Sequence, residues 1–308
     1  MKLTVGLADA VIGIDLLGQA ERAVPLCREI FKDFLYPELD AETELKVIIL
    51  NNQIKTPPIV QQRGRKRVIE EQLLTKDVMV WLDKIHWNSN DFKISESMIA
   101  SYCLGGLLLF DPETSKGCVI LHDGPGCFRP IYRLSWMYLA QVLGERKACF
   151  IHSAAIVREG KGYLFIGESG AGKSTLAGLC NGSIVFSDDR PALCERNGSY
   201  YVYPSPYRQT SLLNGQDRNV CGLSAIAAGF YFIFKDNQTY LANISTVEAI
   251  SDIISRHILF FKYLSLRARS NLFDLLFEAC HKIPTYKLYF CLDQDIWETI
   301  EFSNLRIT

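Results

Sequence analysis

Several features that define common protein classes are absent from this chain of 308 residues. Its 33 basic and 34 acidic residues leave a formal net charge of −1, so no general electrostatic attraction directs it to nucleic acid or to an anionic membrane. The N-terminus lacks the apolar stretch of a secretory signal. The longest apolar run, from Leu223 to Phe234, is interrupted by a serine and a glycine and is shorter than the roughly 20 residues of a membrane span.

The ten cysteines form neither a disulfide framework nor a metal-binding pattern. They are dispersed, without a Cys-x-x-Cys pair or a cluster with histidine at metal-ligand spacing, which is typical of reduced, mostly buried thiols. We therefore expect a cytoplasmic protein that binds neither nucleic acid nor membrane. With 48% hydrophobic and 22% charged residues, the chain can bury a sizeable core, and its length favours two domains or one large domain with an appendage.

The hydrophobic pattern predicts a smaller N-terminal α+β region over residues 1–95 and an α/β domain over residues 96–308. The second domain is expected to begin with antiparallel strands at Gly106–Phe110 and Cys118–His122. A helix with one buried stripe is expected from about Tyr132 to Glu145. Farther along, Ser245 and Glu248 fit a capping box that opens a helix, with residues 256–263 as its continuation.

A phosphate-binding loop is the most specific motif. The sequence Gly167-Glu168-Ser169-Gly170-Ala171-Gly172-Lys173-Ser174-Thr175 satisfies G-x-x-x-x-G-K-[ST] and follows an expected buried strand. Its glycines permit a curved backbone whose N–H groups point inward at phosphates. Lys173 supplies a charge for the β- and γ-phosphates, and the Ser174 hydroxyl can contact Mg²⁺. A coincidental match is expected in only about one per cent of chains this long, so we expect nucleotide binding here.

Two adjacent carboxylates, Asp188 and Asp189, follow an expected strand at Ile184–Ser187. A carboxylate at a strand end beside a phosphate loop is where a second Mg²⁺ contact is usually supplied. The other carboxylate can accept the proton of a hydroxyl that attacks the γ-phosphate. Both serve one site only if the strand ends or twists at Asp188, because successive strand residues point to opposite faces. The alternative is a turn with exposed acids, and which aspartate would bind metal stays open.

His152 gains a functional interpretation from its predicted place in a hairpin. If residues 148–157 and 162–167 pair around a two-residue loop at 159 and 160, or at 160 and 161, His152 lies across from Gly167 or Ser169. Either register puts the imidazole against the phosphate loop. The alternative is an ordinary core histidine.

Together these residues resemble a known family over about Ala148 to Pro206. A histidine on a strand, a phosphate-loop lysine 21 residues later and an Asp-Asp pair after the next strand resemble the catalytic domain of HPr kinase/phosphorylase. That domain is distantly similar to ATP-dependent phosphoenolpyruvate carboxykinase. The resemblance implies a compact, often oligomeric α/β fold that binds ATP through residues 167–175. It also implies Mg²⁺ held by Ser174 and one aspartate, while the other aspartate and His152 handle the acceptor proton.

The chain departs from that family after the aspartate pair. The Glu-hydrophobic-Arg-Gly signature is absent from Asp188-Asp189-Arg190-Pro191-Ala192-Leu193-Cys194-Glu195, so the resemblance does not imply phosphorylase activity or HPr as the substrate. The length and the segment Tyr203 to Pro206 look more like HPr-kinase-like proteins of peptide-modification clusters. Arg190 and Arg208 are the nearest candidates to stabilise transferred phosphate, with ordinary salt-bridged arginines as the alternative.

The sequence thus predicts an ATP- and Mg²⁺-dependent kinase that acts on a hydroxyl, with serine favoured, of a peptide, a protein or a small molecule. The predicted catalytic residues are His152, Lys173, Asp188 and Asp189, and the chain is expected to be able to form a homo-oligomer. One alternative is a regulatory switch that binds ATP but transfers little phosphate. A carboxykinase-like lyase is disfavoured because no basic anion-binding motif is recognisable on the acceptor side.

Overall fold

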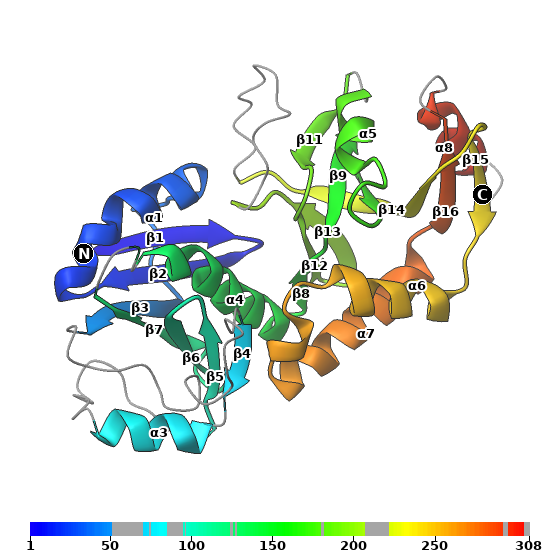
Figure 1. Cartoon of the computed structure of the whole chain (residues 1–308). Helices are drawn as coiled ribbons and strands as arrows, with labels where there is room; N and C mark the ends of the chain where they lie inside the picture. The colour runs from blue at the N-terminus through cyan, green and yellow to red at the C-terminus, as the bar shows by residue number, and fades with distance from the viewer. Residues whose placement is uncertain are drawn as a thin grey trace. The chain divides into compact units, whose positions relative to one another are not determined.

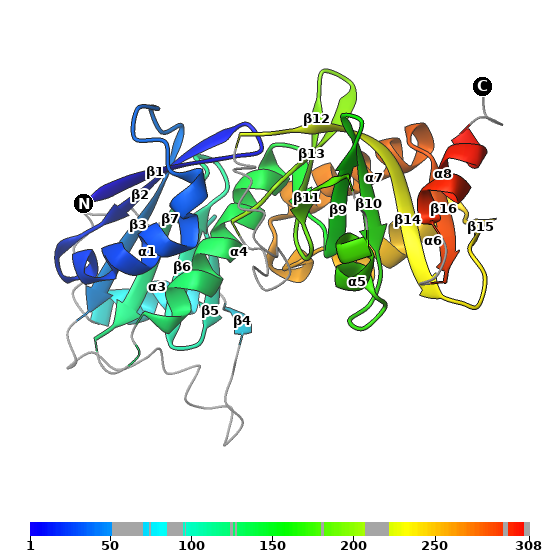
Figure 2. The same ribbon diagram turned by 90° about the horizontal axis from the view of Figure 1, so that it is seen from above.

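The computed structural model describes residues 1–50, 70–73, 75–84, 95, 97–123, 126, 128–179, 182–206, 222–291 and 295–304, and it is a mixed α/β structure (Figures 1 and 2). The chain divides into two compact units. Unit 1 comprises Met1–Arg146 and Lys262–Arg269, and unit 2 comprises Lys147–Phe261 and Ser270–Thr308. Within the described ranges, no helix is long and apolar enough to cross a membrane. Arg208 lies outside the described residues.

Unit 1 is built on one twisted sheet with the strand order β1-β2-β3-β7-β6-β5-β4. Its strands are β1 (Lys2–Leu7), β2 (Ala10–Leu16), β3 (Thr43–Leu50), β4 (Glu70–Leu73), β5 (Ile99–Cys103), β6 (Gly106–Asp111) and β7 (Lys116–His122). The helices are α1 (Val24–Phe31), with short 3₁₀ segments at Gly18–Ala23 and Lys32–Phe34, α3 (Thr75–Lys84) and α4 (Arg129–Glu145). The expected antiparallel pair around residues 111–117 is confirmed as β6 and β7.

Helices cover both faces of this sheet. Trp81 of α3 lies in a buried cluster with Leu107 and Leu109 of β6. On the other face, the Tyr138 ring of α4 makes an edge contact with Phe110, with ring centroids 6.0 Å apart. Because side chains alternate along a strand, a strand covered on both faces is apolar throughout, and β6 is buried at every position except its last residue.

The boundary between the units differs from the sequence-based expectation. Strand β7 pairs in parallel with β3, from Leu45↔Gly117 to Leu50↔His122, so residues 99–122 complete the N-terminal sheet. The N-terminal part of unit 1 therefore extends to Arg146. The domain boundary that the sequence predicted after residue 95 is wrong. The pattern of residues 96–129 gave strands but not their partners, because the pairing of β7 with β3 joins segments about seventy residues apart.

Unit 2 carries the second sheet, with the order β11-β9-β10-β14-β13-β12-β8 and β16 paired with both β14 and β15. Its strands are β8 (Ala148–Phe150), β9 (Ser153–Arg158), β10 (Lys161–Ile166), β11 (Ile184–Ser187), β12 (Ala192–Arg196), β13 (Ser199–Tyr203), β14 (Ala225–Lys235), β15 (Tyr240–Asn243) and β16 (Thr285–Phe290). Its helices include α5 (Lys173–Leu179), α6 (Thr246–Asp252), α7 (Leu266–Lys282), whose first turn counts with unit 1, and α8 (Ile296–Asn304).

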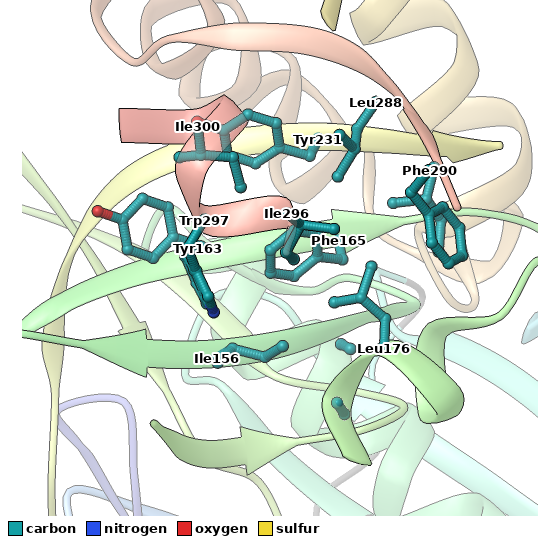
Figure 3. Packing of buried hydrophobic residues seen from close by; sticks show 13 residues of the cluster. Ile156, Tyr163, Phe165, Leu176, Tyr231, Leu288, Phe290, Ile296, Trp297 and Ile300 are labelled. Atoms are coloured by element: carbon teal, nitrogen blue, oxygen red, sulfur yellow. The ribbon is translucent and has the colours of Figure 1, made fainter. Parts of the chain in front are cut away.

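One face of this sheet packs against α5 and α8. Leu176 of α5 and Trp297 of α8 belong to a buried cluster with Phe165, Tyr231 and Phe290 from three adjacent strands (Figure 3). The Phe165 and Tyr231 rings stack with centroids 5.6 Å apart. This packing fixes α5, and with it the loop that precedes α5, relative to β10, β14 and β16.

Three strands of unit 2 end at the same edge of the sheet. Strand β14 runs parallel to β10 and to β16, and carboxyl ends of parallel strands share one edge. The segment after Ile166, the end of β14 at Lys235 and the end of β16 at Phe290 therefore meet there. The expected phosphate loop occupies this edge.

Candidate functional site

The phosphate-binding motif forms the predicted strand-loop-helix unit. Strand β10 ends at Ile166, and α5 begins at Lys173. Gly170 and Gly172 have φ values of +84° and +105°, which side chains with a Cβ rarely adopt. A Cβ at Gly167 would lie 2.9 Å from Ile233 Cγ1 of β14. The motif glycines are thus required by backbone conformation and by the close approach of β14.

Lys173 is buried and lies folded against its own loop. Its side-chain ammonium donates hydrogen bonds to the carbonyl oxygens of Gly167 and Glu168, at 2.6 and 3.0 Å. Burial lowers the pKa of Lys173, and the negative charge of Asp189 partly opposes this shift. The lysine and Asp189 are therefore within electrostatic reach of each other. A phosphate group would offer Lys173 a charged partner in place of two neutral carbonyls.

The predicted hairpin before the loop is confirmed, in the register that has its two-residue turn at residues 159 and 160. Arg158 pairs with Lys161, and the ladder ends at Ser153↔Ile166, which places His152 level with Gly167. However, residues 148–157 are not one strand. The chain breaks after β8, where Ile151 donates its N–H to Pro191 O, and His152 lies in the break rather than on a strand. Its backbone N–H donates to His257 O at 2.8 Å.

His152 and Asp189 form the central polar contact of the site. His152 Nε2 lies 3.3 Å from Asp189 Oδ1, and the other carboxylate oxygen pairs with Arg190 Nη1 at 2.6 Å. Burial and the Lys173 ammonium lower the pKa of His152 to about 4, although Asp189 opposes the shift. His152 is consequently neutral near pH 7. Arg190 is therefore salt-bridged, which is the alternative that the sequence left open beside a role in stabilising transferred phosphate.

The turn after β11 explains how two adjacent aspartates can both be buried. Asp188 and Asp189 are each 6% exposed, so the alternative interpretation, a turn with exposed acids, is wrong. Ser187 Oγ accepts hydrogen bonds from the N–H groups of Asp189 and Arg190, at 3.3 and 2.9 Å. This serine turn ends the strand at the predicted position. Ser153 N–H then donates to Asp189 O at 3.0 Å, which fixes the second aspartate beside β9.

A divalent cation would need ligands from a bound nucleotide as well as from this chain. No group of three or more histidine, cysteine, aspartate or glutamate side chains with metal-site geometry occurs among the residues that the structure describes. The predicted set of Ser174, Asp188 and Asp189 offers hard oxygen atoms, which Mg²⁺ prefers, and Mg²⁺ usually combines one or two carboxylates with substrate phosphates and water. The donor chemistry therefore fits Mg²⁺ that arrives with a phosphorylated ligand.

Several residues at the site were not predicted from the sequence. Helix α6 begins at the expected Ser245 cap, but it ends at Asp252 and continues as a π-helical turn, Ile253–His257, instead of the expected helix over 256–263. Within this turn, Arg256 Nη1 lies 3.0 Å from Glu168 Oε1 of the phosphate loop. The His257 ring centroid is 6.0 Å from that of His152.

Lys235 at the end of β14 is a further cation beside the loop. Its Cε would lie 3.3 Å from a Cβ at Gly172. No local motif marks Lys235 or Arg256. Only the parallel pairing of β10 with β14 and the position of the π-helical turn bring these cations to the loop. The signal in the sequence that could have indicated Lys235 is its position as a basic residue directly after a long apolar run.

Comparison with known protein families gives one match over this region. A family model described as "SynChlorMet cassette protein ScmC" matches residues 131–305, which is more than half of the chain and includes the phosphate loop, His152 and both aspartates. The chain belongs to the ScmC family. No curated protein matches it. The matched segment contains most of α4 and all but the last three residues of unit 2, and the description of the family assigns no activity.

Proposed function

We propose that this ScmC-family protein is an ATP- and Mg²⁺-dependent kinase that transfers the γ-phosphoryl group to a hydroxyl. The observation that carries the proposal is the convergence of a phosphate-loop lysine with a His-Asp pair. Lys173 lies within electrostatic reach of both Asp189 and His152, whose side chains are 3.3 Å apart. A loop that only bound nucleotide would need the lysine and one carboxylate, and the additional pair of a half-buried His152 with a buried Asp189 is suited to proton transfer.

In this proposal the loop binds and neutralises the phosphates. Backbone N–H groups of residues 167–175 surround the β-phosphate, and Lys173 exchanges its two carbonyl partners for phosphate oxygens. Lys235 adds a second positive charge from β14. When bound, Mg²⁺ would neutralise charge that develops on the phosphates during transfer, with Ser174 and Asp188 as its protein ligands.

The geometry favours Asp189 over Asp188 for proton transfer. Asp189 contacts His152 through one oxygen and Arg190 through the other, so it is held in one orientation and linked to a neutral imidazole. The acceptor oxygen forms a bond to the γ-phosphorus as the bond from that phosphorus to the β-bridging oxygen breaks. ADP leaves, and the hydroxyl proton passes to the Asp189–His152 pair. We assign Asp188 to the metal.

The wider assignment rests on the same residues. We propose an HPr-kinase-like P-loop fold for unit 2 and a cytoplasmic location. The hydroxyl-bearing acceptor is a peptide, a protein or a small molecule, with serine favoured, and homo-oligomers are compatible with this assignment. The absence of the Glu-hydrophobic-Arg-Gly signature after Asp189 argues against phosphorylase activity.

Lys173→Ala tests the proposal. We expect the wild type to bind Mg·ATP and to transfer the γ-phosphoryl group to at least one member of a panel of serine-containing peptides and small alcohols. We expect Lys173→Ala to lose transfer by at least about 100-fold, because charge stabilisation by the ammonium is lost. Lys161→Ala, which changes an exposed lysine at the start of β10, is the matched control.

The assay also separates the kinase from the alternatives. Binding of Mg·ATP without transfer to any acceptor would favour the regulatory switch. If Lys173→Ala folds and retains normal transfer, the phosphate-loop assignment is wrong.

A further inference from the structure

A pocket of about 320 Å³ lies on the opposite face of the unit 2 sheet from α5. Its lining combines side chains from β14, β16, α6, the π-helical turn and the link between β15 and α6, namely Phe232, Phe234, Ile244, Glu248, Ser251, Asp252, Ser255, Arg256 and Lys287. Phe232 and Phe234 face this pocket because strand residues alternate, whereas Tyr231 and Ile233 belong to the cluster around α5. The volume lies within the range of small-molecule sites.

The pocket adjoins the phosphate loop directly. Arg256, one of its lining residues, is 3.0 Å from Glu168 of that loop, and Phe234 precedes Lys235, whose side chain lies beside Gly172. The sheet order β11-β9-β10-β14-β16 puts Asp188, Asp189 and β9 on one side of β10 and the pocket on the other. Neighbouring strands lie about 4.8 Å apart, so β16 is only about 10 Å from β10.

This arrangement gives the two ends of a bound triphosphate different surroundings. The γ-phosphate must lie near Lys173 and the carboxylates that follow β11. A phosphate chain laid across the end of β10 then directs its other end toward Lys235, β14 and β16. The pocket lies where the nucleoside would follow the phosphates.

The charges of the pocket are matched in pairs. Lys287 Nζ lies 2.7 Å from Glu248 Oε1, and Arg256 Nε lies 3.2 Å from Asp252 Oδ1. Because these pairs compensate one another, the pocket does not select a strongly charged group. Its lining combines carboxylate and hydroxyl oxygens with two aromatic side chains, and this combination suits a neutral, flat heterocycle with amino groups on its edge.

A row of stacked aromatic rings continues outward from Phe234, one of the lining residues of the pocket. Phe234 is 43% exposed, and its ring stacks on Tyr289 with centroids 5.2 Å apart. The Tyr289 ring in turn stacks on Tyr240 at 4.7 Å. Exposed, contiguous aromatic surface is typical of binding sites, and nucleobases stack on such side chains.

We propose that this pocket binds the purine base of the nucleotide whose phosphates occupy the loop, with Phe234 as the stacking residue. The assignment rests on the proposed nucleotide-binding function. It predicts that the pocket contributes to affinity for ATP but not for inorganic tripolyphosphate, which carries the phosphates without a base.

Calorimetric titrations of the full-length protein with ATP and with tripolyphosphate, each with Mg²⁺, test this proposal. We expect Phe234→Ala to weaken ATP binding by about 5- to 150-fold and to leave tripolyphosphate binding unchanged. Phe273→Ala, which removes an aromatic ring that is 50% exposed on α7 and outside the pocket, is the matched control and should change neither.

A second variant tests the pocket by filling it. Ser251 is exposed at the end of α6, so Ser251→Trp should fold and should block the base while tripolyphosphate still binds. The base assignment is overturned if the wild type binds both ligands equally, or if both variants bind ATP normally. The base assignment is also overturned if the two variants lose affinity for ATP and for tripolyphosphate equally. If the wild type binds neither ligand, the proposed function itself fails.

Discussion

The two phosphate-loop glycines with positive φ allow a sharp test of the loop conformation. Gly170→Ala and Gly172→Ala each place a Cβ on a backbone that side chains rarely adopt, with φ values of +84° and +105°. Their surroundings differ. A Cβ at Gly170 meets no atom within 4 Å, whereas a Cβ at Gly172 would lie 2.9 Å from Phe290 Cζ.

The difference in surroundings sets the expected magnitudes. A left-handed conformation costs a non-glycine residue about 1–2 kcal/mol, and this is the whole cost at Gly170. At Gly172 the new methyl group also presses on Phe290, which is 2% exposed within the cluster around α5. Such overpacking costs about 1–3 kcal/mol. We therefore expect Gly172→Ala to lower the free energy of unfolding by about 2–5 kcal/mol and Gly170→Ala by about 1–2 kcal/mol.

Urea denaturation followed by circular dichroism measures both variants against the wild type. Hydrogen exchange of the amides of β10 and β16 shows whether the loss occurs in unit 2, where Phe290 lies. Equal destabilisation by the two substitutions would refute the reasoning, because it would mean that Phe290 does not crowd Gly172. A larger loss for Gly170→Ala would contradict the loop conformation itself.

Two further predictions concern the polar residues. We expect Asp189→Asn to slow phosphoryl transfer by about 10²- to 10⁴-fold with little change in Mg·ATP affinity. Asp188→Asn should weaken Mg·ATP affinity at least about tenfold. Calorimetry measures the affinities and single-turnover assays measure transfer, and the opposite pattern would show that the roles of the two aspartates are exchanged. The pKa of His152 is about 4 in the folded protein, against an ordinary value of 6.5. As the pH falls, the imidazole therefore binds a proton in the unfolded chain before it does so in the folded protein. The contribution of His152 to stability is then fully present above pH 6.5 and is lost as the pH falls toward 4. The loss is at most about 3 kcal/mol, reduced by solvent screening of the partly exposed ring. In urea denaturation at pH 7.5 and 5, His152→Gln should show a smaller fall than the wild type, and an identical fall in both would contradict the shifted pKa.

Local sequence patterns determined the elements that carry the candidate site. Gly167 to Thr175 marks its own loop because Gly170 and Gly172 adopt positive φ values that other residues adopt only with strain. The expected two-residue turn limited the pairing of β9 with β10 to two registers, and the structure has the one with the turn at residues 159 and 160. Ser187 ends β11 where the pattern placed the strand end. The Ser245 cap set the start of α6. In each case the physical cause acts over a few residues, so it can be recognised without the fold.

Contacts between distant segments decided the rest. Whether residues 99–122 belong to the N-terminal or the C-terminal unit depended on the pairing of β7 with β3, which no local pattern encodes. The break at His152 arises from hydrogen bonds to residues 191 and 257. Arg256 and Lys235 reach the phosphate loop only because β14 lies beside β10 and a π-helical turn follows α6. The sequence therefore determined the local elements and most of the candidate polar groups, and tertiary packing decided which groups meet.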